Sequence, residues 1–287
     1  MSLGSFFLYN VLMSNKYFLT HKNVEEQIEI LISRGIDVDD KKILESINYS
    51  HLIYKYGIHY LQNKENLNVY RKGVKLSHLY NLFLFNNDLS MKLLKIIFKF
   101  EHSLKWAIAY ELTTINPLNY LNNDFYSKSG ANYPDEIVFF IENMKKLEKN
   151  KRRKYKEEYY ISGKLPLWLL VDEMAFGQLR MLLKLTASSV NVAEKLRVTQ
   201  NKNIFLKYLI TVNTYRNIIC HANPLKALSQ TNSGKKVTLK NLIKFIKSYY
   251  HKDFLEIKLF FDNFDFSKIN IEKEKLIDIL GLNTFFN

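Results

Sequence analysis

Apolar residues recur at helical spacing along most of the chain. The clearest run covers residues 76–112, where leucine, isoleucine and phenylalanine return every three or four positions. This period is typical of an amphipathic helix. Similar runs cover residues 24–34, 39–47, 135–156, 166–186, 203–222 and 237–261, and a last short one ends at Gly281. The pattern predicts an all-α protein, a helical bundle with additional helices toward both ends.

Local signals place some of the helix ends. Asn23 followed three positions later by Glu26 is typical of a capping box. Asn223 precedes Pro224, which disfavours helical backbone at Asn223 and ends the 203–222 helix. Residues 48–73 are rich in tyrosine with weak periodicity, so we expect turns and short helices there. Residues 229–236 are predicted to form a polar loop.

Composition supports a helical, folded chain. The 287 residues include 9 glycines and 4 prolines, fewer than the turns of a sandwich or barrel usually need. With 47% apolar residues the chain can bury a core of its own. The single cysteine, Cys220, excludes a disulfide within the chain and any site that needs several cysteines. No cofactor or metal is therefore expected, and the cysteine content favours the cytoplasm.

The charge balance favours an anionic partner. Forty-two Lys and Arg against 28 Asp and Glu give a net charge of +14, which suits nucleic acid or an anionic membrane surface. The alternative is an AT-rich codon usage that inflates lysine without selecting a binding surface. No apolar run approaches the length of a membrane span, so no membrane segment is predicted. The first residues lack the features of a secretory signal, and Met1 or Met13 is expected as the native start.

The candidate chemistry lies in residues 214–225. Arg216, Asn217 and His221 are polar positions in a largely apolar helical segment. At 100° per residue, Asn217 and His221 lie about 40° apart on one face, whereas Arg216 lies about 140° from His221. A cationic imidazole at a helix end beside a guanidinium is a minimal set for cleaving an RNA phosphodiester without metal. The alternative is structural: Arg216 pairs with an acid, Asn217 caps a turn and His221 ends the helix.

Arg216, Asn217 and His221 resemble the R-x4–6-H motif of the HEPN superfamily, an all-helical group rich in ribonucleases. The surrounding sequence is similar to the Abi-like family of bacterial abortive-infection proteins, of the AbiD/AbiF type. The similar segments are residues 17–35, 48–56, 79–105, 165–179 and 216–221. The resemblance covers about residues 16–228. We expect these residues to form one compact HEPN-like domain, which can be divided into an N-terminal half, 16–115, and a C-terminal half, 133–228. Residues 235–287 are then a C-terminal helical extension.

The resemblance implies a toxin-like endoribonuclease of phage defence. His221 would act as general acid or base, Arg216 would stabilise charge on the scissile phosphate, and Asn217 would orient one of them. HEPN sites are commonly completed by two facing motifs, which implies a homodimer. The resemblance also leaves room for an antitoxin or a phage protein as a trigger. After His221, however, the family often continues with a second His and then R-L-W-N, where this chain has Ala222 to Leu225. This departure keeps open the alternative of an inactive HEPN fold that binds RNA or protein.

Further charged residues have candidate roles. Glu173 is a candidate partner that anchors Arg216. Glu101 either pairs with Lys105 one turn later or lines a cleft. The densest basic run is either a solvated helix face or a surface that follows RNA phosphates. It contains Lys151, Arg152, Arg153 and Lys154.

Overall fold

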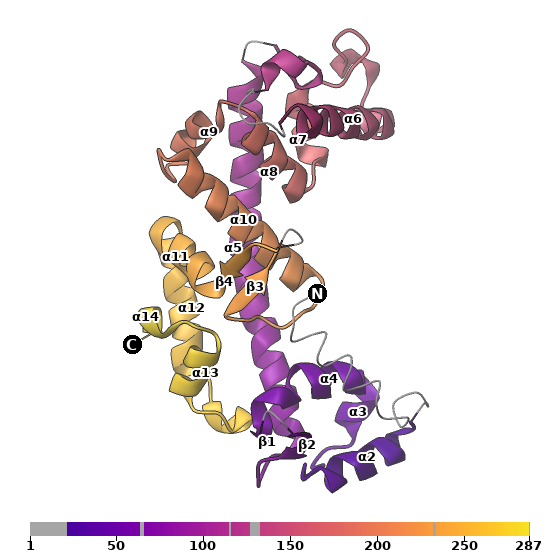
Figure 1. Ribbon diagram of the computed structural model, residues 1–287, viewed down its shortest axis with the longest axis vertical. Helices are drawn as coiled ribbons and strands as arrows, with labels where there is room; N and C mark the ends of the chain where they lie inside the picture. The colour runs from indigo at the N-terminus through magenta and orange to yellow at the C-terminus, as the bar shows by residue number, and fades with distance from the viewer. Residues whose placement is uncertain (1–21, 64–65, 115, 127–132, 232–233, 287) are drawn as a thin grey trace. The chain divides into compact units, whose positions relative to one another are not determined.

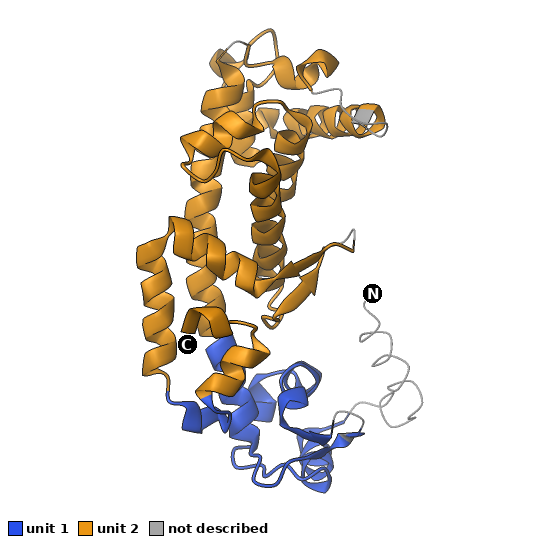
Figure 2. Ribbon diagram, turned by 60° about the vertical axis from the view of Figure 1, so that its left-hand side comes forward, with its two compact units in different colours: residues 1–86, 265–272 blue, residues 87–264, 273–287 orange. Residues whose placement is uncertain are grey.

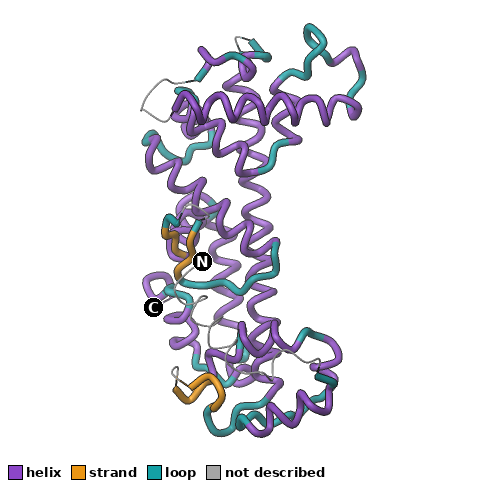
Figure 3. The backbone as a smooth tube through the Cα atoms, turned by 45° about the vertical axis from the view of Figure 1, so that its right-hand side comes forward, coloured by secondary structure: helices purple, strands orange, loops and turns teal. Residues whose placement is uncertain are grey.

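The computed structural model describes residues 22–63, 66–114, 116–126, 133–231 and 234–286. Helices form most of these residues, as Figure 1 and Figure 3 show, and the all-α class is confirmed. The α-helices are α2 (Val24–Ser33), α3 (Lys42–Ser46), α4 (Tyr49–Lys55), α5 (Leu76–Thr113), α6 (Tyr133–Lys151), α7 (Leu167–Glu173), α8 (Phe176–Leu185), α9 (Ser189–Lys195), α10 (Lys202–Cys220), α11 (Leu239–Tyr249), α12 (His251–Asn263), α13 (Lys273–Ile279) and α14 (Asn283–Phe286).

Two antiparallel strand pairs interrupt the helices in the described residues. Strand β1 (Leu61–Asn63) pairs with β2 (Asn66–Tyr70), and β3 (Leu228–Gln230) pairs with β4 (Lys236–Thr238). Short 3-10 helices fill several connections. They are η2 (Gly57–Tyr60), η3 (Asn119–Leu121), η4 (Asn123–Phe125), η5 (Arg152–Lys154), η6 (Glu157–Tyr159) and η7 (Phe266–Ile269).

The chain divides into two compact units, coloured in Figure 2. Unit 1 comprises residues 1–86 and 265–272, and unit 2 comprises residues 87–264 and 273–287. In unit 1 the fully buried Tyr60 donates a hydrogen bond to the Ile269 carbonyl at 2.6 Å. This bond ties the returning segment 265–272 to η2.

Unit 2 has an aromatic core around α5. Phe100 of α5 contacts Phe176 of α8 and Phe245 of α11, with ring centroids 6.3 and 5.0 Å apart. All three side chains are buried. Helix α10 packs against α8, α9 and α11. These contacts cover one face of α10, and a groove lies along another face of the same helix.

Several sequence expectations are corrected by the structure. The tyrosine-rich segment 48–73 contains the β1–β2 pair, and the expected loop 229–236 is framed by β3 and β4. The expected helix 166–186 is two helices, because Met174 and Ala175 both adopt extended backbone. The expected helix 237–261 likewise breaks at Tyr250, whose φ and ψ are −134° and 52°. Helix α9 was not expected.

The bounds 16–228 and 235–287 remain a prediction, because compact packing does not establish which segments fold alone. The alternative starts at Met1 and Met13 lie outside the described residues, as does the beginning of the resembling segment 17–35. None of the described helices combines the length and the apolarity needed to cross a membrane.

Candidate functional site

Helix α10 carries the motif and holds His221 at its end. The Asn201 side chain accepts the Ile204 amide at 3.1 Å and caps the start of the helix. At the other end His221 is the C-cap residue, followed by Ala222 in the left-handed conformation with φ of 50°. The Asn223 amide donates to the Ile218 carbonyl at 3.0 Å. This is the bonding of a Schellman motif, which fixes the position of the imidazole-bearing residue.

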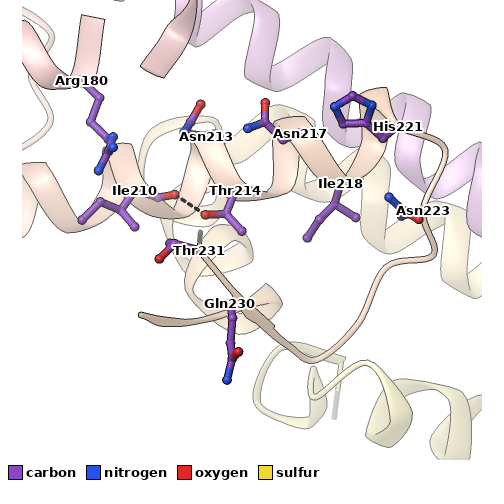
Figure 4. A pocket seen from close by; sticks show the side chains of 10 residues that line it. All are labelled: Arg180, Ile210, Asn213, Thr214, Asn217, Ile218, His221, Asn223, Gln230 and Thr231. Atoms are coloured by element: carbon purple, nitrogen blue, oxygen red, sulfur yellow. Dashed lines mark hydrogen bonds between the residues drawn. The ribbon is translucent and has the colours of Figure 1, made fainter. Parts of the chain in front are cut away.

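A groove of about 350 Å³ runs along α10, with further lining residues from α8 and β3. Figure 4 shows Asn213, Asn217 and His221 in a row on the helix. Arg180 reaches the groove from α8 and lies at the end remote from His221, beside Ile210. The other lining residues are Thr214, Ile218, Asn223, Gln230 and Thr231. The structure thus brings Asn217 and His221 to one groove, as their spacing on the helix predicts.

Arg216 faces a different neighbour. Its Nε lies 3.8 Å from the Glu101 Oε2 on α5, and Glu101 is only 7% exposed. The same carboxylate pairs with Lys105 at 3.8 Å, so the expected intrahelical pair is present. Lys105 also donates to the Asp172 carbonyl at 2.9 Å. Within one chain, therefore, Arg216 lies beside the acid Glu101, while His221 lies in the groove.

Arg180 is a groove residue that the sequence reasoning missed. Its side chain is half-buried, and its buried Nε has no hydrogen-bond partner among the described residues. Burial lowers the pKa of this guanidinium from its ordinary value. The signal in the sequence is an arginine between Leu179 and Met181 in an apolar helix. That signal indicates partial burial but not the groove, which requires the packing of α8 on α10.

The comparisons with known proteins identify the family. Residues 42–226 match the family described as Abi-like protein. The chain belongs to the Abi-like family. Neither the search of curated proteins nor that of solved structures gave a significant match. The family name associates the chain with abortive infection, the bacterial defence against phage, and the matched range contains Arg180, Arg216, Asn217 and His221. Membership of the HEPN superfamily remains a prediction.

In this Abi-like protein the Glu173 carboxylate contacts side chains of the basic run 151–154. It accepts hydrogen bonds from Lys154 and Tyr155 and forms an ion pair with Lys151 at 2.8 Å. The hydrogen bonds from the two lysines lower the pKa of Glu173 to about 2. The anchoring of Arg216, which the sequence analysis assigned to Glu173, is provided by Glu101 instead.

The rest of the basic run of this Abi-like protein has mixed surroundings. Arg152 makes bidentate hydrogen bonds at 2.9 Å to Glu148, which is 2% exposed and also accepts the Leu165 amide. Arg153 is exposed. Carboxylates thus contact three of the four basic side chains, which lowers their capacity to neutralise RNA phosphates. The RNA-binding role of this run remains a prediction.

Proposed function

We propose that this Abi-like protein is a metal-independent endoribonuclease of phage defence. The observation that carries the proposal is an exposed His221 beside Asn217, at a fixed helix end in an open groove. Imidazole is the side chain that most often transfers protons near neutral pH. In the proposed reaction His221 removes the proton of a 2′-hydroxyl or protonates the leaving oxygen. Asn217, one turn away, orients the imidazole or the phosphate by hydrogen bonds.

The proposed reaction also needs a cation at the scissile phosphate, and we assign that role to Arg216. Arg216 lies beside Glu101, away from the groove of its own chain. A homodimer in which two motifs face each other would place Arg216 of one copy near His221 of the other. RNA and a second copy are therefore the proposed partners, with an antitoxin or a phage protein as the regulator.

Cleavage of defined RNA in the presence of EDTA tests the proposal. The wild type is expected to cleave, and His221→Ala is expected to lose about 10²–10⁴-fold in rate. His251→Ala is the matched control, because His251 is also exposed but lies on α12 and does not line the groove. A substrate with a 2′-deoxy nucleotide at the cleaved position should resist cleavage. Full activity of His221→Ala, or loss of wild-type cleavage in EDTA, would refute the assignment.

Two observations favour a second function, that of an RNA-binding module without turnover. Arg216 has a carboxylate neighbour already, and Ala222 to Leu225 replace the polar residues that often follow the motif in the family. This function predicts that the logarithm of RNA affinity falls linearly with the logarithm of salt concentration. It also predicts no cleavage by the wild type, which separates it from the first function.

A further inference from the structure

The groove contains one permanent charge among its described lining residues, and that charge is Arg180. The ten lining residues include no carboxylate, and the remaining polar ones carry amide, hydroxyl or imidazole groups. A half-buried guanidinium whose buried N–H lacks an acceptor is stabilised when an anion or a hydrogen-bond acceptor contacts it. The buried Nε of Arg180 has no such acceptor in the described part of the chain. The groove therefore suits an anion, and none of the described lining residues supplies one.

We propose that Arg180 binds a backbone phosphate of single-stranded RNA at the end of the groove remote from His221. This inference rests on the proposed function for the identity of the ligand and adds a second contact point to the same groove. A guanidinium presents several donors in a planar fork that suits phosphate oxygens. Arg180 is thus assigned to substrate binding and takes no part in the proton transfers.

The length of the groove defines which phosphate Arg180 contacts. Arg180 lies beside Ile210 and His221 lies at the helix end, eleven residues further along α10 (Figure 4). At 1.5 Å rise per residue this separation is about 16 Å. One phosphate cannot contact both side chains over that distance. Arg180 therefore contacts a phosphate a few nucleotides away from the bond at His221.

The lining between these ends indicates single-stranded RNA. Asn213 and Asn217 lie between Arg180 and His221, and Gln230 lies on the facing strand β3. Amide side chains both donate and accept, as contacts to base edges and sugar hydroxyls require. Bases of a single strand are free to turn toward such groups, whereas those of an A-form duplex are not. The groove therefore fits a short single-stranded segment.

Binding measurements on the full chain test the role of Arg180. His221→Ala serves as the non-cleaving background, and fluorescence anisotropy measures its affinity for a labelled single-stranded RNA octanucleotide and for a dinucleotide. Adding Arg180→Gln should weaken octanucleotide binding roughly ten- to hundredfold, the usual effect of losing a charged hydrogen bond. It should also reduce the salt slope by about 0.7, the value for one phosphate of a single strand. Dinucleotide binding should not change, because a dinucleotide cannot reach from His221 to Arg180.

Two further variants control for charge and folding. Lys240→Gln removes an equal charge from an exposed position in the first turn of α11, outside the groove lining, and should leave the salt slope unchanged. Arg180→Lys keeps the charge and should retain the slope while losing the affinity of the planar fork. Thermal unfolding followed by circular dichroism checks that each variant is folded.

The outcomes separate this inference from the proposed function. Equal octanucleotide affinity and equal salt slope with and without Arg180→Gln would overturn the role of Arg180, even if the wild type cleaves RNA. The absence of any octanucleotide binding would overturn it as well. If the wild type does not cleave but binding depends on Arg180 as described, the inference stands and the nuclease assignment fails.

Discussion

The pairing of Arg216 with Glu101 makes a quantitative prediction about stability. Glu101 is 7% exposed, and its carboxylate faces Arg216 and Lys105 at 3.8 Å each. Two unit charges at about 4 Å interact with about 4 kcal/mol at an effective dielectric constant of 20. The Arg216 side chain is 30% exposed, and its Nε makes no hydrogen bond among the described residues. Solvent screening and a second cation reduce the expected coupling between Arg216 and Glu101 to about 1–2 kcal/mol.

A double-mutant cycle measures this coupling. Arg216→Met, Glu101→Gln and the double variant are compared with the wild type by urea unfolding. Each single variant should lower the free energy of unfolding, and the double variant should lose about 1–2 kcal/mol less than the sum of the two. Lys275→Met, at an exposed position on α13, provides the additivity control with Glu101→Gln. That pair of changes should add to within about 0.5 kcal/mol.

The result that refutes this reasoning is additivity of the Arg216 and Glu101 variants. A coupling below about 0.5 kcal/mol would mean that the ion pair contributes nothing measurable. Arg216 would then be free to turn toward a substrate without breaking a stabilising contact. A coupling of the expected size means that any movement of Arg216 away from Glu101 must be compensated by the ligand.

Three further predictions concern stability near the groove and the basic run. The pKa of Glu173 is held at about 2 against an ordinary 4.5, so the stability that its charge contributes is complete above pH 4.5 and is lost toward pH 2. Glu173→Gln should therefore lower the free energy of unfolding at pH 7. A difference in unfolding free energy from wild type that stays constant in urea titrations down to pH 2 would contradict this. Ala222→Gly should stabilise the chain by about 0.5–1 kcal/mol, since a left-handed φ of 50° is costly for alanine; an unchanged or lower melting temperature would count against it. Tyr215→Phe should lower the free energy of unfolding by about 1–2 kcal/mol in denaturant titrations, because the buried hydroxyl donates to the Lys226 carbonyl at 2.9 Å. The same variant should show faster amide hydrogen exchange in residues 222–226, and unchanged protection there would contradict this prediction.

The parts of the fold that the sequence predicts depend on nearby residues. The capping box of Asn23 and Glu26 is present, with the Asn23 side chain accepting the Glu26 amide at 2.8 Å. The 76–112 pattern corresponds to α5, and the expected end before Pro224 corresponds to the end of α10. Each of these features depends on side chains within one or two helical turns, which periodicity and capping rules describe.

The features that the sequence does not predict depend on distant partners. Met174 and Ala175 carry no proline or glycine signal, yet the chain breaks there between α7 and α8. Arg216 pairs with Glu101, more than a hundred residues earlier in the chain, rather than with Glu173. In the same way, only the packing of α8 beside α10 brings Arg180 to the groove. Helical spacing predicted that Asn217 and His221 share a face but not which charges surround them.

The positions of Arg180 and Arg216 limit which arginine could contact a scissile phosphate at His221. Arg180 lies beside Ile210, which precedes His221 by eleven residues or about 16 Å of helix, and Arg216 lies beside Glu101. In the proposed nuclease, either Glu101 releases Arg216 within one chain, or a second copy supplies the guanidinium. Mixing His221→Ala with Arg216→Ala distinguishes these arrangements, because a mixed dimer with facing motifs contains one site with both groups intact. Recovery of RNA cleavage on mixing two inactive variants therefore requires the composite site, whereas a mixture as inactive as its components contradicts the composite site.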